Sequence, residues 1–209
     1  MKNDLQQALK AMQIDADEAQ QVLLLGFIDL LEKWNKAYNL TAIRNKRDML
    51  PLHVLDSLSV LPYLAEAKRI LDVGSGAGLP GIPLAILEPE REFVLLDGNG
   101  KKTRFIKQVV IELKLKNVTV VHDRIEKFLP ETGFECITTR AFATIAETLD
   151  MIRHFLSPDA RVLFMKSNTA KEELKKIGEE YKQQIIDLAV PKIAAPRTLV
   201  ILQQNPLPK

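Results

Sequence analysis

Cysteine is nearly absent from this sequence, since Cys136 is the one residue of its kind. A single thiol forms no internal disulfide and no cysteine-rich zinc site. The three histidines, His53, His122 and His154, lie far apart in the sequence and lack the spacing of metal ligands. We therefore expect no metal centre in this protein.

Long apolar runs are also missing. None approaches the ~18 residues that a membrane-spanning helix needs, and the first residues mix Lys, Asn, Asp and Gln where a secretory signal would have an apolar core. With 46% hydrophobic and 27% charged residues, the 209-residue chain has the balance of a globular protein. We expect it to work in the cytoplasm, without a membrane partner.

A strong excess of charge of one sign is absent too, because the formal net charge is only +2. This value is too small to indicate a nucleic-acid partner by itself. The basic residues are nevertheless clustered in two places, and such clusters are either solvated helix faces or contacts for an acidic partner. The first cluster contains Lys33, Lys36, Arg44, Lys46 and Arg47, and the second contains Lys101, Lys102, Arg104 and Lys107.

The order of the hydrophobic patterns predicts an α/β protein with a Rossmann-like, mostly parallel, seven-stranded sheet flanked by helices. Helical spacing in the first third predicts an N-terminal helical extension, residues 1–64, packed on a core domain, residues 65–209. Strands that alternate with helices indicate a parallel sheet covered on both faces, and the two closely spaced last strands indicate an antiparallel edge. Strands are expected at 69–73, 93–97, 118–121, 136–139, 161–165, 185–190 and 198–203, and helices at 3–12, 17–37, 51–64, 101–115, 144–156 and 170–184, with a short one ending near 87.

A glycine-rich segment follows the first predicted strand, at the end where open parallel sheets bind their ligands. Gly74, Gly76 and Gly78 carry no side chain, so the backbone can turn sharply there and approach a ligand closely. Pro80 suits the first turn of the helix that follows. Asp97 ends the second strand roughly 20 residues after Gly78, where a carboxylate accepts hydrogen bonds from ribose hydroxyls. The segment therefore predicts a site for a cofactor that contains adenosine.

The glycine spacing alone fits two classes of cofactor. Gly76, Gly78 and Gly81 satisfy the fingerprint of dinucleotide-binding proteins, which leaves a nicotinamide-dependent oxidoreductase open. Asp72, on the strand before the loop, favours S-adenosylmethionine, because a carboxylate there repels a pyrophosphate but suits an ammonium and a sulfonium. Residues for hydride chemistry, such as a Tyr-Lys pair at helical spacing, are not found in the sequence.

Longer motifs in the sequence resemble those of a more narrowly defined group of proteins. Asp72-Val-Gly-Ser-Gly-Ala-Gly resembles the first motif of class I methyltransferases, and it continues as Leu-Pro-Gly-Ile-Pro-Leu-Ala85. Further segments are Lys33-Trp-Asn-Lys-Ala-Tyr-Asn-Leu-Thr41, His53-Val-Leu-Asp-Ser57, Leu96-Asp-Gly-Asn-Gly-Lys-Lys-Thr-Arg-Phe105 and Arg140-Ala-Phe-Ala143. In this order, and over essentially the whole chain, they resemble the bacterial ribosomal RNA small-subunit methyltransferase G family (RsmG, also called GidB).

The resemblance implies a reaction and a set of site residues. The family transfers a methyl group from S-adenosylmethionine to N7 of one guanosine in the decoding-region loop of 16S rRNA, in the 30S ribosomal subunit. Arg140, at the mouth shared by cofactor and substrate, is the residue expected to have a catalytic role. The sequence departs from relatives at Gly98, where they carry Ser, and at Lys127, where many have a second acid. The expected cofactor-binding residues are Gly74, Gly76, Leu79, Asp97, Ile125, Glu126 and Arg140.

The implied reaction needs little acid–base chemistry. N7 of guanine carries a lone pair and no proton, so positioning alone can accelerate methyl transfer to it. The sequence agrees with this, because it lacks the Asp/Asn-Pro-Pro-Tyr motif that serves exocyclic amines. Methylation at a pyrimidine carbon would need a nucleophilic cysteine, and Cys136 lies in a strand that we expect to be buried.

Several side chains have both a functional and a structural interpretation. Lys101, Lys102 and Arg104 begin a helix at the ligand-binding edge, where RNA phosphates are favoured. Lys166, at the end of the fifth strand, is expected either to meet an RNA phosphate or to have no such role, and for Arg140 the alternative to a role in the site is a structural ion pair. Two other functions also stay open: a methyltransferase that acts on a small molecule or a protein, and a module that binds S-adenosylmethionine without turnover. A structural role is favoured for Trp34 and His53, and Phe142 is expected to be a core aromatic, with stacking on a splayed base as the alternative.

Overall fold

The computed structural model describes residues 1–167 and 169–205. Its strands are β1 (Arg69–Val73), β2 (Glu92–Leu96), β3 (Val118–Val121), β4 (Cys136–Arg140), β5 (Arg161–Lys166), β6 (Tyr181–Asp187) and β7 (Thr198–Gln204). Its α-helices are α1 (Lys2–Ala11), α2 (Glu18–Tyr38), α3 (Lys46–Met49), α4 (Asp56–Leu58), α5 (Gly81–Leu87), α6 (Gly100–Glu112), α7 (Ile145–Ile152) and α8 (Ala170–Leu174). A π-helical turn covers Leu50–Leu55, and 3-10 turns cover Leu61–Leu64 and Ile125–Lys127.

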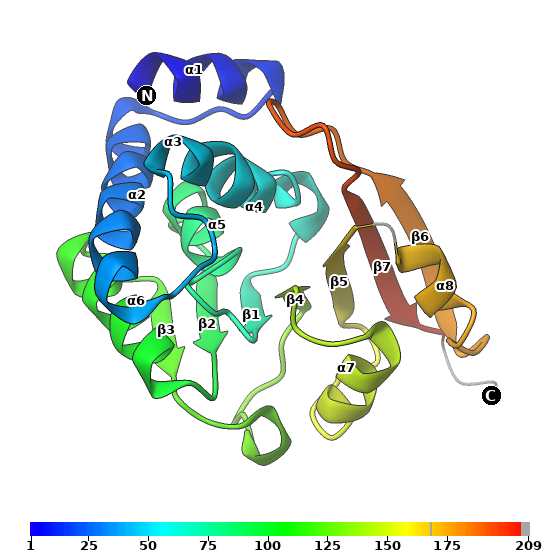
Figure 1. Cartoon of the computed structure of the whole chain (residues 1–209). Helices are drawn as coiled ribbons and strands as arrows, with labels where there is room; N and C mark the ends of the chain where they lie inside the picture. Colours follow the sequence, from blue (N-terminus) through cyan, green and yellow to red (C-terminus); the bar gives the residue numbers. More distant parts are fainter. Residues whose placement is uncertain (168, 206–209) are drawn as a thin grey trace.

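The strands form one seven-stranded sheet in the order β3-β2-β1-β4-β5-β7-β6. Strands β1 to β5 pair in parallel, whereas β7 runs antiparallel to both β5 and β6 (Figure 1). The pairing of Lys166 with Thr198 brings the first residue of β7 beside the last residue of β5. The prediction of a parallel sheet whose outermost strands are antiparallel is confirmed. The first residues of β7 lie beside the carboxyl ends of the parallel strands.

Alternate residues of the central strands face opposite layers of helices, as the two-residue period of a strand requires. On β5, Leu163 and Met165 pack in the apolar cluster that includes α1, α2, α5 and α6. Their neighbours Val162 and Phe164 pack in a second cluster with α7 and α8. Both faces of the sheet are therefore covered, which explains why these strands read as continuous apolar runs.

The N-terminal helices share the main apolar core with the sheet. Leu5 of α1 and Leu24 and Phe27 of α2 are fully buried, in the same cluster as Ile70 of β1. This packing, more than helical propensity, fixes α1 and α2 in place. The division of the chain at residue 64 into an extension and a core domain stays a prediction.

The prediction of one continuous helix over 51–64 is wrong. The segment contains the π-helical turn, the short α4 and a 3-10 turn instead of one helix. Proline lies in the first turn of two of these pieces, Pro51 in one and Pro62 in the other. Because proline lacks a backbone N–H and clashes with the preceding turn, each residue interrupts a regular helix.

The helix predicted over 170–184 is also wrong, since α8 ends at Leu174 and β6 begins at Tyr181. Most residues of β6 are exposed, including Lys182, Gln183 and Gln184, so the strand shows no apolar alternation. It forms because β7 supplies hydrogen-bonding partners along its length. Such an edge strand depends on tertiary pairing that local sequence does not record.

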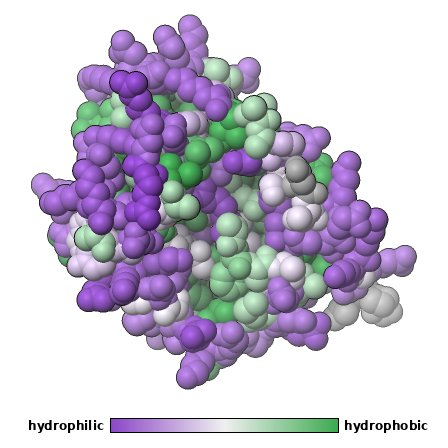
Figure 2. Space-filling view, in the orientation of Figure 1, coloured by the Kyte–Doolittle hydropathy of each residue, from purple (hydrophilic) through white to green (hydrophobic). Residues whose placement is uncertain are grey.

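Among the residues that the structure describes, no helix combines the length and the apolar character needed to cross a bilayer. Hydrophilic side chains cover most of the face shown in Figure 2, and hydrophobic ones gather toward its middle. Single exposed apolar side chains, such as Ile111 and Leu129, are ordinary on a folded protein.

Candidate active site

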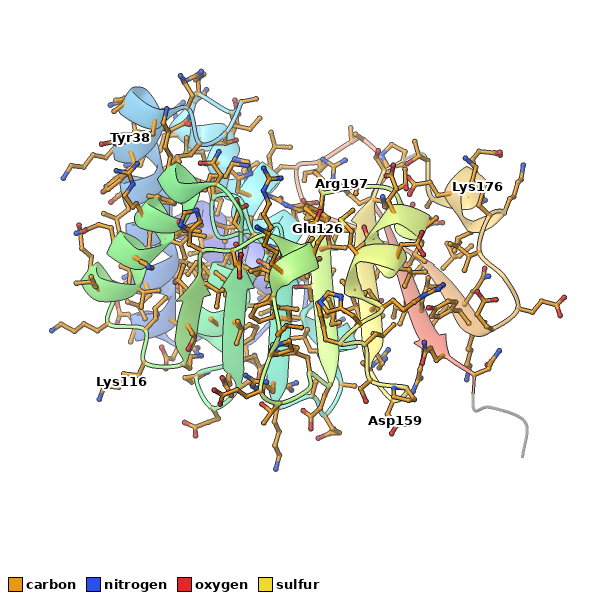
Figure 3. All side chains as sticks on the ribbon, turned by 90° about the horizontal axis from the view of Figure 1, so that it is seen from below. Tyr38, Lys116, Glu126, Asp159, Lys176 and Arg197 are labelled. Carbon is orange, nitrogen blue, oxygen red and sulfur yellow. The ribbon has the colours of Figure 1, made fainter. Side chains whose placement is uncertain are left out.

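Two adjoining cavities lie where the parallel strands end. The larger has a volume of about 720 Å³ and the smaller about 530 Å³, and Gly74, Lys102 and Ala141 line both. We call them the large and the small cavity. Figure 3 shows Glu126 and Arg197 toward this edge of the sheet, with Lys116 and Asp159 at the opposite edge. The site thus occupies the position at which open α/β sheets bind ligands.

The predicted site residues divide between the two cavities. Gly76, Leu79 and Arg140 line the large one, whereas Asp97, Ile125 and Glu126 line the small one. Gly74 lies where the two meet. The structure therefore places all seven predicted residues around two adjoining cavities.

The glycine loop depends on backbone conformations that side chains disfavour. Gly74 has φ +65° and Gly76 has φ +58°, both in the left-handed region. A Cβ atom added at Gly74 would also lie 2.2 Å from Cδ2 of Phe142. Phe142 therefore covers Gly74 at the junction of the cavities, and its side chain is 38% exposed. The expectation that Phe142 packs in the core is wrong, because it lines the small cavity.

Asp97 holds the glycine loop and faces the small cavity. Its Oδ2 accepts a hydrogen bond from the backbone N–H of Gly76 at 2.8 Å, and its Oδ1 accepts one from Asn99 at 2.7 Å. Each carboxylate oxygen has a further lone pair. The side chain is thus fixed in orientation and still able to accept hydrogen bonds from a ligand.

The role of Asp72 differs from the predicted one, in which its carboxylate meets the positive charges of the cofactor. Its carboxylate is buried and lines neither cavity; Oδ2 accepts the N–H of Gly81 at 2.8 Å, and Oδ1 lies 3.4 Å from Thr138 Oγ1. Burial raises the pKa of Asp72 to about 7, although the hydrogen bonds from Gly81 and Thr138 act in the opposite direction. The residue supports the start of α5 from beneath the loop, so its charge does not meet a ligand directly.

Arg140 belongs to a cluster of charged groups that line the large cavity. Its Nη1 donates to Oδ2 of Asp56 at 2.8 Å and to the carbonyl of Leu52 at 3.1 Å. Oδ1 of the same carboxylate accepts a hydrogen bond from Nε of Arg197 at 2.9 Å. We call Asp56, Arg140 and Arg197 the arginine cluster. All three residues line the large cavity, and the side chain of Asp56 is less exposed, at 6%, than those of Arg140 and Arg197, at 17% and 23%.

Sequence reasoning missed two members of this cluster. Asp56 appeared only inside a longer motif, and Arg197 was not singled out. A signal for Arg197 was present, because an antiparallel strand predicted at 198–203 begins at the edge where its parallel neighbour ends. The residue before such a strand must lie at the ligand-binding edge.

His53 forms a local network, as predicted. Its Nδ1 lies 3.0 Å from the carbonyl of Leu52 and its Nε2 lies 2.9 Å from Oγ1 of Thr41. The carbonyl can only accept, so Nδ1 carries the proton and Nε2 accepts the hydroxyl proton of Thr41. Burial, helped by the nearby Arg140, lowers the pKa of His53 to about 4. The imidazole is therefore neutral near pH 7, and it anchors the wall of the large cavity.

Lys166 reaches the large cavity but is already paired. Its Nζ lies 2.8 Å from Oε2 of Glu173 and donates to the carbonyl of Ala143 at 2.7 Å. Burial alone would raise the pKa of Glu173, yet hydrogen bonds from Lys166, Thr169 and the N–H of Ile145 lower it. Lys166 is thus held in an ion pair at the cavity, and its contact with an RNA phosphate stays a prediction.

The two basic clusters differ in their surroundings. In the first, Lys46 pairs with Asp29 at 2.5 Å and with Glu32 at 3.5 Å, and Lys36 also approaches Glu32 at 3.5 Å. In the second, Lys101, Lys102 and Arg104 lie in the first turns of α6, and Lys102 lines both cavities. The second cluster therefore reaches the site through Lys102.

Two further predictions concern the core. Cys136 is fully buried, and this burial raises the pKa of its thiol to about 12, so it is a core residue as predicted. Trp34 packs against Phe105 at 5.7 Å between ring centroids, which confirms its structural role. In the described ranges, 1–167 and 169–205, no group of three His, Cys, Asp or Glu side chains is arranged to hold a metal ion.

Comparisons with known proteins give the same fold and identify a family. The family model described as rRNA small subunit methyltransferase G matches residues 20–200. The protein of that name from Stutzerimonas stutzeri is 50% identical, over 92% of this chain and 90% of its own length. Its counterpart from Ectopseudomonas mendocina is 47% identical, over 97% and 95%.

A solved structure supports the fold alone. The SAM-dependent methyltransferase from Aquifex aeolicus superimposes with a TM-score of 0.58 and 18% identity, over 74% of this chain and 92% of that one. The predicted class I methyltransferase fold is therefore confirmed, and the resemblance found in the motifs extends over nearly the whole length of full relatives. The chain belongs to the rRNA small subunit methyltransferase G family.

Proposed function

We propose that this protein transfers a methyl group from S-adenosylmethionine to N7 of a guanosine in the decoding-region loop of 16S rRNA. The observation that carries the proposal is the close match, over more than nine-tenths of the chain, to proteins named ribosomal RNA small subunit methyltransferase G. Family membership also sets aside the nicotinamide-dependent oxidoreductase that the glycine spacing left open. The proposed substrate places the reaction in the cytoplasm.

The small cavity suits the adenosine end of the cofactor. Asp97 presents a carboxylate whose orientation is fixed by two backbone N–H groups, as a partner for ribose hydroxyls requires. Ile125 offers an apolar wall for a purine ring, and Glu126 lies beside it. Gly74 lies at the junction with the large cavity, where its lack of a side chain leaves room for the ring of Phe142.

The large cavity suits the amino-acid end of the cofactor and the target base. Arg140 carries a permanent charge that can hold a carboxylate, and Leu79 and Gly76 line the same space. When bound, S-adenosylmethionine supplies a methyl group activated by the positive sulfur. The protein's own contribution is to hold the base and the methyl donor in line, with water excluded from the contact between them.

N7 of guanine needs no general base, and the carboxylate that the described residues bring to the large cavity, that of Asp56, is already engaged by two arginines. Among the described residues that line the cavities, the one imidazole belongs to His53, and both of its nitrogens are engaged in hydrogen bonds. The lone thiol, Cys136, is buried away from both cavities. A nucleophile that carries its own free lone pair fits such a site better than an exocyclic amine or a pyrimidine carbon.

The second basic cluster gives the RNA a place to bind. Lys101, Lys102 and Arg104 lie at the N-terminus of α6, where the helix dipole also attracts phosphate. Their edge of the sheet is the edge that carries both cavities. We expect these residues to contact the RNA backbone without reading its sequence.

The test is methyl transfer from labelled S-adenosylmethionine to 30S subunits that lack the modification, followed by nucleoside mass spectrometry. We expect 7-methylguanosine in 16S rRNA, lost in Asp97→Ala and Arg140→Ala. Asp159→Ala, at the opposite edge of the sheet, is the control and should retain activity. Binding of the cofactor without labelled RNA would refute the proposed substrate and direct attention to small-molecule or protein acceptors.

A further inference from the structure

The arginine cluster has more positive than negative charge. One carboxylate, that of Asp56, lies between two guanidinium groups, and its side chain is only 6% exposed. Buried charges are normally matched within the protein. Asp72 also interacts electrostatically with Arg140, so the positive charge left over in the cluster is that of Arg197, which lines the large cavity. Such an imbalance is expected where a ligand brings the missing negative charge.

Arg197 has N–H donors that the cluster does not use. Its Nε donates to Asp56, and its Nη1 donates to the neighbouring carbonyl of Pro196 at 3.1 Å. The described part of the chain gives Nη2 no acceptor. Because a guanidinium is planar, the Nε bond to Asp56 fixes the direction in which the remaining N–H groups point. Arg197 is therefore oriented by the protein and still has donors free.

The position of Arg197 separates it from the cofactor. The residues proposed to hold the cofactor lie at or after the ends of β1, β2, β3 and β4, whereas Arg197 immediately precedes β7. In the sheet, β7 lies three places from β1, a separation of roughly 14 Å at the usual strand spacing. A ligand that runs from the small cavity over Gly74 meets Arg140 first. Arg197 lies beyond it, farther along the sheet from β1.

We propose that Arg197, oriented by Asp56, binds a backbone phosphate of the RNA substrate next to the target guanosine. The inference rests on the proposed function, because only a nucleic-acid substrate brings a phosphate to this end of the cavity. Arg140 and Arg197 then share one carboxylate but serve different ligands. Arg140 faces the cofactor, and Arg197 fixes the register of the RNA, a task that phosphate contacts perform in nucleic-acid complexes.

The experiment measures RNA affinity and cofactor affinity separately in Arg197→Gln. Binding of an unmodified 16S rRNA fragment is followed by filter retention across a salt titration, and binding of S-adenosylmethionine is followed by calorimetry. We expect the RNA affinity to fall roughly tenfold and the salt dependence to flatten by roughly 0.7 to 0.9 in slope, the share of one phosphate. Cofactor affinity should stay within about twofold of the wild-type value, since Arg197 does not touch the cofactor.

The matched control is Arg161→Gln. Arg161 is similarly half-buried and also donates to a backbone carbonyl, that of Tyr63, but it lies at the opposite end of β5. Its replacement should leave the salt slope unchanged. If Arg197 only props up Asp56 and Arg140, then Arg197→Gln will weaken cofactor binding while the salt slope stays at the wild-type value, and the proposal is overturned.

A second variant keeps the inference testable if Arg197→Gln does not fold. Asp56→Asn retains an acceptor for one arginine but removes the negative charge, so it unmasks further positive charge at the same place. We expect a steeper salt dependence of RNA binding, opposite in sign to the effect of Arg197→Gln. An unchanged slope would overturn the phosphate contact. Because these readouts use binding, wild-type methyl transfer to 30S subunits tests the proposed function independently.

Discussion

Replacement of Asp72 by asparagine should change how the stability of this protein depends on pH. The carboxyl group is buried against the first turn of α5, and its pKa is raised from 3.8 to about 7. Asparagine has nearly the same shape and retains an oxygen to accept the N–H of Gly81. Its amide N–H group can donate to the hydroxyl of Thr138, which then donates to the carbonyl of Leu71. The variant therefore removes the titration and keeps the contacts.

The sign follows from proton binding. Between about pH 4 and pH 7 the folded state holds the Asp72 proton while the unfolded state releases it, so wild-type stability falls as pH rises. Below that window the group is protonated in both states and carries no penalty. Above it the group is ionised in both, and the full penalty applies. A shift of roughly three units at about 1.4 kcal/mol each sets an upper limit of about 4 kcal/mol.

The assay is urea unfolding of both proteins at several pH values from about 4.5 to 8. We expect Asp72→Asn to gain stability relative to the wild type as pH rises, with most of the gain below about pH 7. Asp159→Asn, an exposed carboxylate far from the site, should show no such trend. If the difference between wild type and Asp72→Asn is the same at every pH, Asp72 does not titrate as the burial argument requires.

Three other perturbations test the site and the core. Gly74→Ala should lower the free energy of unfolding by about 1–2 kcal/mol, because φ is +65° and the new Cβ meets Phe142; an unchanged denaturation midpoint would contradict the strain. Asp97→Asn should weaken S-adenosylmethionine binding roughly tenfold or more in calorimetry, because one backbone N–H then faces an amide N–H group; an unchanged Kd would remove Asp97 from the site. Cys136 should resist iodoacetamide in the native protein and react after unfolding, because burial raises the pKa of its thiol to about 12; rapid labelling of the native protein would show that β4 is accessible.

The parts of the site that sequence reasoning located are those with a local signal. A short apolar strand followed by glycines positions Gly74 and Gly76, and an acid at the end of the next strand positions Asp97. In each case a few neighbouring residues determine both the backbone conformation and the place at the edge of the sheet. The strand boundaries of β1, β3 and β4 were predicted closely for the same reason.

The parts that were missed depend on contacts between distant residues. Asp56 and Arg197 meet only because the N-terminal layer and the antiparallel edge both reach the large cavity. The direction of the Asp72 carboxylate was misjudged because strand position gives the face of a residue but not the hydrogen bond that its side chain selects. β6 was misplaced because its pairing with β7, and not its own pattern, makes it a strand.

The arginine cluster also bears on how the protein acquires its activity as it folds. The bond between Arg197 and Asp56 joins residues 141 positions apart, whereas Asp97 and Gly76 are separated by only 21. Contacts of low sequence separation close with a smaller loss of chain entropy and tend to form earlier. The half of the site that faces the cofactor can therefore assemble while β7 is still unpaired. The half proposed to face the RNA is completed only when the antiparallel edge docks, so a partly folded chain would bind the methyl donor before it could engage a ribosome.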